Sequence, residues 1–123
     1  MQRFMILIQG GFAPLEGLPP EALQAHLHKW HAWTQHLIER GHYLAGDGLR
    51  NAGRRLEARA GEVTVTEGPF AESTELLGGF YILQCRDLDE ATALAHQSPN
   101  FEFGGRVEVR PFLEFVPDNQ TAF

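Results

Sequence analysis

The sequence predicts an α+β domain of the ferredoxin-like, split βαβ kind, with an added hairpin. Its apolar segments follow the order strand, long helix, strand with a hairpin, strand, helix, strand, which matches that plan. Two of the strands are apolar on both faces, as is typical of the centre of a sheet. At 123 residues, with 43% hydrophobic and 21% charged residues, the chain fits one globular domain over residues 1–123.

The first strand and the long helix come first. The run RFMILIQG, closed by Gly10, predicts a strand buried on both faces. After a proline-rich loop, residues 21–40 contain neither glycine nor proline and predict a helix, with Gly41 as its C-terminal cap. At about 100° per residue, one stripe of this helix faces the core. The stripe contains Leu23, Leu27, Trp30, Trp33 and Leu37, with His26 at its edge.

The remaining elements follow from shorter patterns. HYLAGDGL predicts a short strand, and RRLEARAGEVTVT predicts a hairpin that turns at Gly61-Glu62. GGFYILQC predicts a central strand, and Asp87 is expected to cap the second helix, with Glu90 as its capping-box partner. The closing strand RVEVRPFLEF contains Pro111, which cannot donate to a ladder, so we expect it at a sheet edge.

Oligomeric state is predicted from the same pattern. Two helices can cover only one face of such a sheet, yet the first and central strands are apolar on both faces. A second copy is the simplest cover for the other face. We therefore predict a homodimer packed sheet to sheet.

Charge and motifs exclude several classes. Ten Lys and Arg against sixteen Asp and Glu give a formal charge of -6, which repels nucleic acid and anionic lipid. No apolar run is long enough for a membrane span and no secretory signal is recognised, so we expect a cytoplasmic protein. No phosphate loop, GxSxG, HExxH, CxxC or dinucleotide fingerprint is present, and we expect no cofactor.

The histidines and the cysteine have plain interpretations. On the first helix only His28 and His31 have the i, i+3 spacing that could share a metal, and both lie away from the core stripe, so no metal site is predicted. The single cysteine, Cys85, lies in an apolar strand and is interpreted as a small buried hydrophobe rather than a nucleophile.

One family resemblance runs over nearly the whole chain. Its segments are FMILIQGG, KWHAW, GHYLAGDGL, VTEGPFAESTELLGGFYI, DLDEATALA and FEFGGRVEVRPF. Together they resemble the YCII-related proteins, in particular the subgroup named after an Asp-Gly-Pro-Phe signature. That resemblance implies a dimeric ferredoxin-like α+β barrel.

The resemblance also has departures. Glu67 stands where the subgroup usually has aspartate, and Ser73-Thr74 stands where TK or AK is common. Some members occur beside or fused to extracytoplasmic-function sigma factors, and some distant relatives resemble enzymes that use a histidine and aspartate pair on small aromatic substrates. No histidine here falls on that position, since His26 and His31 lie a few residues away, so the pair is not carried over.

The predicted function is binding of a small aromatic or carboxylate-bearing molecule in a cleft between the sheet and the first helix, with cofactor-free acid–base chemistry. His26 and Glu67 are the candidate catalytic residues. The candidate ligand-binding residues are Trp30, Trp33, Phe70, Glu72, Tyr81 and Arg110.

Structural alternatives stay open for these residues. A histidine at the position of His26 is usually a satisfied core or boundary residue, and tryptophans at helical spacing are core residues first. Arg110 could form an ion pair with Glu67 or Glu72 at a dimer interface, or a fork for an anionic ligand. The rival function is a non-enzymatic accessory or regulatory dimerisation module linked to sigma-factor control. The two functions differ in whether the corner from Glu67 to Glu75 faces a cavity or a partner subunit.

Overall fold

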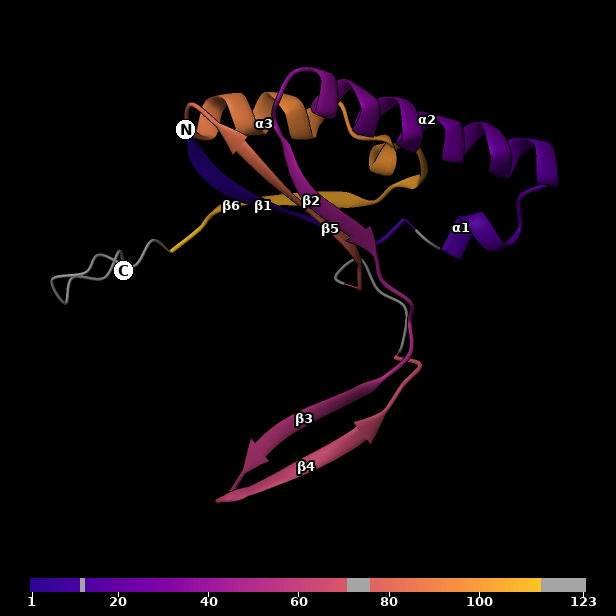
Figure 1. The fold of residues 1–123 in the computed structure, drawn as a ribbon. Coiled ribbons are helices and arrows are strands. Elements are labelled where there is room, and N and C mark those ends of the chain that lie inside the picture. The colour runs from indigo at the N-terminus through magenta and orange to yellow at the C-terminus, as the bar shows by residue number, and fades with distance from the viewer. Residues whose placement is uncertain (12, 71–75, 114–123) are drawn as a thin grey trace, which may run out of the picture.

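A computed structural model describes residues 1–11, 13–70 and 76–113, with the backbone alone for residues 13 and 14. The ribbon in Figure 1 shows a sheet with helices on one side and a separate hairpin on the other. In chain order the elements are β1 (Gln2–Gln9), α1 (Ala13–Glu16), α2 (Pro20–Glu39), β2 (Tyr43–Gly48), β3 (Arg54–Arg59), β4 (Glu62–Glu67), β5 (Leu77–Cys85), α3 (Leu88–His96), the 3₁₀ helix η1 (Pro99–Phe103) and β6 (Arg106–Pro111).

The main sheet is antiparallel, with strand order β2-β5-β1-β6. β5 lies between β1 and β2, which α2 connects, and β1 lies between β5 and β6, which α3 connects. This is the split βαβ arrangement, so the predicted plan of the fold is confirmed. The predicted central strands are central, and the strand with Pro111 is at an edge. That strand ends at Pro111, however, so the prediction that it continues through Leu113, which is exposed, is wrong.

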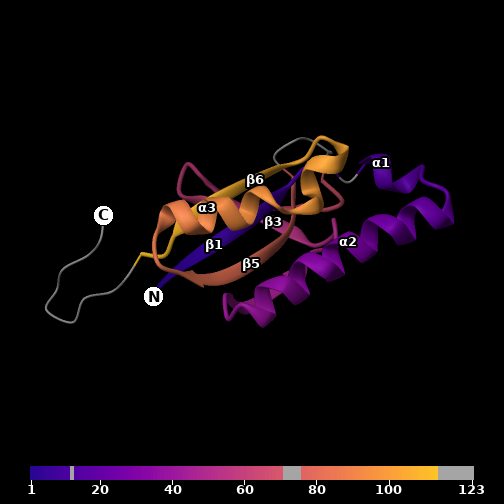
Figure 2. The same cartoon turned by 90° about the horizontal axis from the view of Figure 1, so that it is seen from above.

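The core lies between the sheet and the two long helices, α2 and α3 (Figure 2). Along β1, the side chains of Phe4, Ile6 and Ile8 are buried, and Trp33 and Leu37 of α2 pack against them. The rest of the buried cluster is Leu83, Cys85, Ala91, Leu94 and Ala95.

One part of the predicted helical stripe is wrong. His26 is only 3% exposed, whereas Leu27 is 52% exposed. The N-terminal half of α2 extends beyond α3 toward α1, as Figure 2 shows, so this half does not pack on the centre of the sheet. His26 and Leu27 both line a cavity there, and η1 covers His26 through Glu102 and Phe103, so His26 is buried while Leu27 stays exposed.

The helix caps at Gly41 and Asp87 lie where the sequence predicts them. Gly41 has a φ of 77°, and the amides of Gly41 and His42 donate to the carbonyls of Ile38 and Leu37. The carboxylate of Asp87 accepts from the amide of Glu90 at 2.9 Å, as predicted. Glu90 reaches the amide of Arg86 rather than that of the N-cap residue itself. Neighbouring residues therefore cap the C-terminal end of α2 and the N-terminal end of α3.

The hairpin of β3 and β4 forms its own sheet. Its turn is Ala60-Gly61, with φ values of 49° and 83°, one residue before the predicted turn, because a two-residue primed turn needs positive φ at both positions. Every residue of both strands is exposed. The hairpin projects on the side of the main sheet away from α2 and α3 (Figure 1).

The pairing within the hairpin gives it two unlike faces. Leu56 is opposite Val65 and Ala58 is opposite Val63, and directly paired residues lie on the same face. We call these four residues the apolar hairpin face. The other face carries Arg55, Glu57, Arg59, Glu62, Thr64 and Thr66.

The face of the main sheet opposite the helices is also apolar at its centre. Met5 pairs with Ile82 and Leu7 pairs with Phe80, and these four half-buried residues form what we call the open sheet face. On β6, Arg110 and Glu108 border it. No helix within the described ranges combines the length and the apolarity needed to cross a membrane.

Candidate functional site

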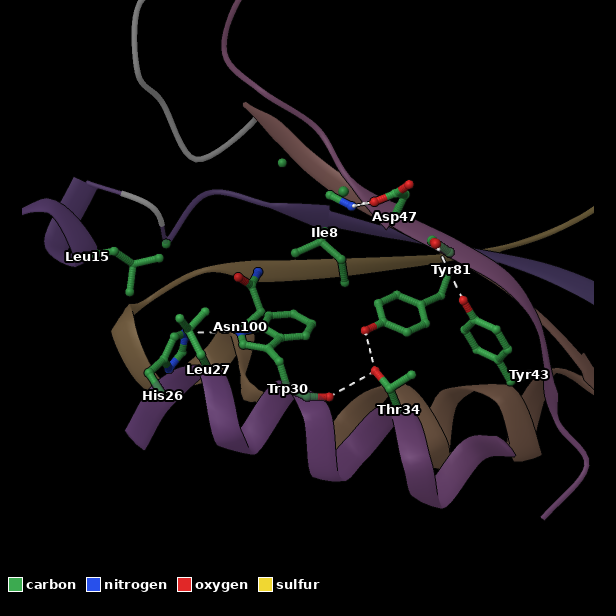
Figure 3. Close-up of a pocket in the computed structure, with 15 residues that line it drawn as sticks. Ile8, Leu15, His26, Leu27, Trp30, Thr34, Tyr43, Asp47, Tyr81 and Asn100 are labelled. Atoms are coloured by element: carbon green, nitrogen blue, oxygen red, sulfur yellow. Dashed lines mark hydrogen bonds between the residues drawn. The ribbon is translucent and has the colours of Figure 1, made fainter. Parts of the chain in front are cut away.

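A cavity of about 440 Å³ lies between α2 and the main sheet (Figure 3). Side chains from α2, β1, β2 and β5 line it, joined by Leu15 of α1 and Asn100 of η1. A side chain at Gly79 would bring its Cβ to 3.0 Å from the carbonyl oxygen of Asp47, and one at Gly46 would come equally close to that of Phe80. These glycines therefore let β2 and β5 approach and leave backbone rather than side chains at the cavity wall.

His26 is held at both ring nitrogens. Its Nδ1 lies 3.0 Å from Oε1 of Glu102, and its Nε2 lies 3.0 Å from Nε1 of Trp30. An indole N–H can only donate, so Nε2 accepts and Nδ1 carries the proton that is donated to Glu102. His26 is therefore the neutral Nδ1–H tautomer, and it fixes the orientation of the Trp30 ring. A ligand can exchange a proton with Nε2 only if it displaces the Trp30 N–H.

Glu102 completes this group from η1. Lys29 forms an ion pair with its other carboxylate oxygen. The hydrogen bond from Lys29, followed by that from His26, lowers the pKa of the Glu102 carboxyl group. The carboxylate is therefore ionised at neutral pH, which keeps it an acceptor for His26.

Tyr81 begins a directed chain of hydrogen bonds. The hydroxyl of Thr34 donates to the carbonyl of Trp30 at 2.9 Å, so the phenol of Tyr81 must donate to Thr34, 2.7 Å away. Burial raises the pKa of the Tyr81 phenol, so the group is neutral. Its oxygen keeps lone pairs that can accept a hydrogen bond from a ligand. Figure 3 shows the hydroxyl groups of Tyr81 and Thr34, both in the cavity wall, pointing toward each other.

Aromatic rings form the apolar part of the wall. The rings of Trp30 and Tyr81 are nearly parallel, with 6.3 Å between centroids, and Tyr43 meets Tyr81 edge-on at 6.0 Å. Trp33 contacts both Trp30 and Tyr81 but does not line the cavity. It is 5% exposed, and its indole N–H donates to the carbonyl of Leu94. Trp33 therefore supports the wall from the core.

Three of the residues predicted for the site lie outside the cavity. The side chain of Glu67 is 70% exposed on the hairpin, where Arg54 binds it at 2.8 Å. Phe70 lies under the guanidinium group of Arg55, 4.4 Å from the ring centroid. The side chain of Arg110 is 67% exposed on β6 near Glu108, at 3.8 Å. Glu72 falls outside the described residues.

The structure thus brings together His26, Trp30 and Tyr81 at the cavity, with Trp33 behind them. Among the described residues, Asp47 is the acidic residue that borders the cavity, whereas the predicted Glu67 does not line it. Sequence reasoning missed Tyr43, Asn100 and Glu102 as site residues. Asn100 is buried and donates to the carbonyls of Gln9 and Arg106, so it ties η1 to the sheet. The sequence carries no local signal for these contacts, because their partners lie on distant segments.

Comparisons with known proteins identify the family of this chain. The profile of the YCII-related domain matches residues 2–116. An uncharacterized protein, R00369, of Rhizobium meliloti (strain 1021) is 43% identical over 67 residues, which is 54% of this chain and 54% of that protein. The chain therefore matches about half the length of this curated relative.

A solved structure that is also similar shares little sequence with this chain. It is 5-chloro-2-hydroxyhydroquinone dehydrochlorinase (TftG) from Burkholderia phenoliruptrix AC1100 in complex with 2,5-dihydroxybenzoquinone, which is 17% identical with a TM-score of 0.46. The alignment covers 96% of this chain and 99% of that one. A similarity this low carries no conclusion about activity. Because the family profile spans nearly the whole sequence, the chain belongs to the family of proteins with a YCII-related domain.

Proposed function

We propose that this protein binds a small, flat molecule, aromatic or carboxylate-bearing, in the cavity between α2 and the sheet. The observation that carries the proposal is the cavity itself, whose volume of about 440 Å³ lies within the range of small-molecule sites. Trp30 and Tyr81 provide apolar walls, and the phenol oxygen of Tyr81 provides an acceptor whose own proton is already committed to Thr34.

Acid–base chemistry without a cofactor is the second part of this proposal. Tyr81 is positioned to accept a hydrogen bond from a ligand hydroxyl, and His26 is the nearby base whose lone pair becomes available once a ligand replaces the Trp30 N–H. Glu67 lies outside the cavity of its own chain, on the hairpin, where it pairs with Arg54. Glu67 and Arg110 enter the proposal only as residues that meet a partner subunit.

We also propose a homodimer, as a dimeric α/β barrel of the subgroup with the Asp-Gly-Pro-Phe signature. A two-stranded hairpin is marginally stable alone in water, yet Leu56, Val63 and Val65 are 63%, 63% and 56% exposed. The open sheet face and the hairpin lie on the same side of the molecule (Figure 1). A second copy that packs sheet to sheet would cover both apolar surfaces at once, which supports this arrangement.

The position of Glu67 also favours the second candidate function, an accessory dimerisation module that works with a sigma factor. In that function the hairpin and the signature residues Glu67 to Phe70 mediate assembly. The cavity then binds no ligand. The two candidates differ in whether the cavity has an occupant.

The two candidate functions can be distinguished by native mass spectrometry of the purified protein, in which the native mass is compared with the denatured mass. A dimer with extra stoichiometric mass supports a ligand site, and Trp30→Ala should lose that mass while His31→Ala, an exposed change on the same helix, retains it. A dimer without extra mass, together with no change in tryptophan fluorescence against a panel of phenols and aromatic acids, would leave the accessory function.

A further inference from the structure

A second group of converging side chains lies at the end of β5, away from the glycines that border the cavity. His42 follows α2, Cys85 ends β5, and Glu90 lies in the first turn of α3. A ring nitrogen of His42, the Sγ of Cys85 and a carboxylate oxygen of Glu90 all lie within 4.8 Å of one another. These three atom types are the usual protein ligands of zinc.

The hydrogen bond of His42 selects the tautomer suited to a metal ligand. Its Nδ1 lies 2.9 Å from the carbonyl oxygen of Gln84, and a carbonyl can only accept, so Nδ1 carries the proton. Nε2 is then the nitrogen with a free lone pair. Metal-bound histidines commonly donate their other N–H to a backbone carbonyl in this way. The amide of Gln84 also donates to the carbonyl of His42, which anchors the residue from both sides.

Glu90 is held in place and ionised. One of its carboxylate oxygens accepts from the amide of Arg86 at 2.9 Å, and the other pairs with Nε of Arg86 at 2.8 Å. The backbone hydrogen bond from Arg86 is the main cause of the lowered pKa of Glu90. Each carboxylate oxygen has more than one lone pair, so both contacts leave acceptor capacity for a cation. Arg86 would then orient the ligand, as outer groups do in metal sites.

Cys85 is fully buried and has no disulfide partner. Burial, with smaller contributions from Glu90 and Asp87, raises the pKa of its thiol to about 11, so without a metal it stays a thiol. Packing accounts for Cys85, and the helix cap accounts for Glu90. The hydrogen bonds to Gln84 place the imidazole of His42 beside both.

We propose that His42, Cys85 and Glu90 bind one Zn²⁺ per chain, with the fourth position open to solvent. Sulfur and nitrogen ligands disfavour Mg²⁺ and Ca²⁺, which prefer all-oxygen sites. On binding, the Cys85 S–H bond breaks, a Zn–S bond forms and the proton passes to solvent. The half-buried His42 and Glu90 give the cation a way in beside the buried thiol. Three protein ligands with one open position is the pattern of zinc sites that act on solvent or substrate.

The test is a metal titration of the full chain after treatment with a chelator. Zn²⁺ is followed by calorimetry and Co²⁺ by absorption, because a thiolate bound to Co²⁺ gives an intense near-ultraviolet charge-transfer band. We expect one Zn²⁺ per chain and that band in the parent protein. Cys85→Ser should lose the band, and Cys85→Ser and His42→Gln should each weaken Zn²⁺ binding by at least about tenfold.

The control is the double variant His28→Ala, His31→Ala, which removes the exposed i, i+3 histidine pair on α2 and should bind Zn²⁺ like the parent. Absence of the cobalt band in the parent, or loss of Zn²⁺ binding in the control, would overturn the proposal. If Cys85→Ser does not fold, the cobalt band of the parent and the affinity of His42→Gln still decide it.

Discussion

Apolar residues are buried in the helix-covered body of the molecule but exposed in the β3–β4 hairpin. In the body, Ile6, Leu37 and Leu83 are completely buried within one chain. In the hairpin, Leu56, Val63 and Val65 are more than half exposed. The body therefore obtains its stabilisation from its own helices, whereas the hairpin carries an apolar face that is exposed among the described residues. One chain thus contains a region whose helix-facing side is fully packed and a hairpin whose apolar residues stay exposed.

The largest expected effect concerns burial in the body. Leu37→Ala should lower the free energy of unfolding by about 2–5 kcal/mol, because it leaves a cavity between α2 and the sheet. Leu56→Ala, the same change on the hairpin, should alter it by less than about 0.5 kcal/mol in dilute, monomeric protein. Urea unfolding of both variants measures the difference. Equal losses would mean that the hairpin is packed in the monomer.

The second effect concerns the apolar hairpin face. Val65→Asp should weaken self-association by about tenfold or more, because it places a charge where an apolar contact is proposed. Thr64→Asp, on the opposite face of the same strand, is the matched control and should leave association unchanged. Sedimentation at several concentrations measures both, with circular dichroism to verify the fold. Equal behaviour of the two variants would argue against a dimer that uses this face.

A third, smaller effect concerns the cavity in the body. Tyr81→Phe removes the phenol oxygen that accepts from a ligand hydroxyl, and it should weaken binding of a phenolic ligand by about 0.5–1.5 kcal/mol. Tyr43→Phe, whose hydroxyl bonds only weakly to the Gly46 carbonyl at 3.4 Å, is the control. Fluorescence titration compares the two. If only Tyr43→Phe weakens binding, the ligand does not use the Tyr81 oxygen.

The smallest expected effect is a pH dependence of protein stability that Glu102 causes. Its pKa is lowered in the folded protein, so its contribution to stability is present above the ordinary value of 4.5 and is lost as the pH falls through the lower folded value. Glu102→Gln should therefore be less stable than the parent at neutral pH, and the gap should narrow in acid. Thermal melting of both proteins from neutral pH to about pH 3 measures the gap. A gap that stays constant with pH would contradict the ionic role of Glu102.

Element type and element order could be predicted from the sequence, because both depend on short-range patterns. The cap at Gly41, the N-cap at Asp87 and the edge position of Pro111 each depend on the conformational limits of one residue and its close neighbours. Apolar residues on both faces likewise identified the two central strands. The hairpin turn was misplaced by one residue, since Ala60 adopts a positive φ that alanine rarely takes.

The composition of the candidate site was decided by the tertiary structure. His26 meets Glu102 across 76 positions and Tyr81 meets Thr34 across 47, and no local pattern reports such pairs. His42 and Cys85 likewise converge from separate elements. Glu67, the residue that the signature made prominent, is carried away from the cavity by a hairpin that projects from the other side of the sheet. The sequence by itself determined the plan of the fold and its apolar faces, because those are local properties of the chain. Only the packing of distant segments decided which polar groups face the cavity, since that depends on where helices and strands come to lie in space.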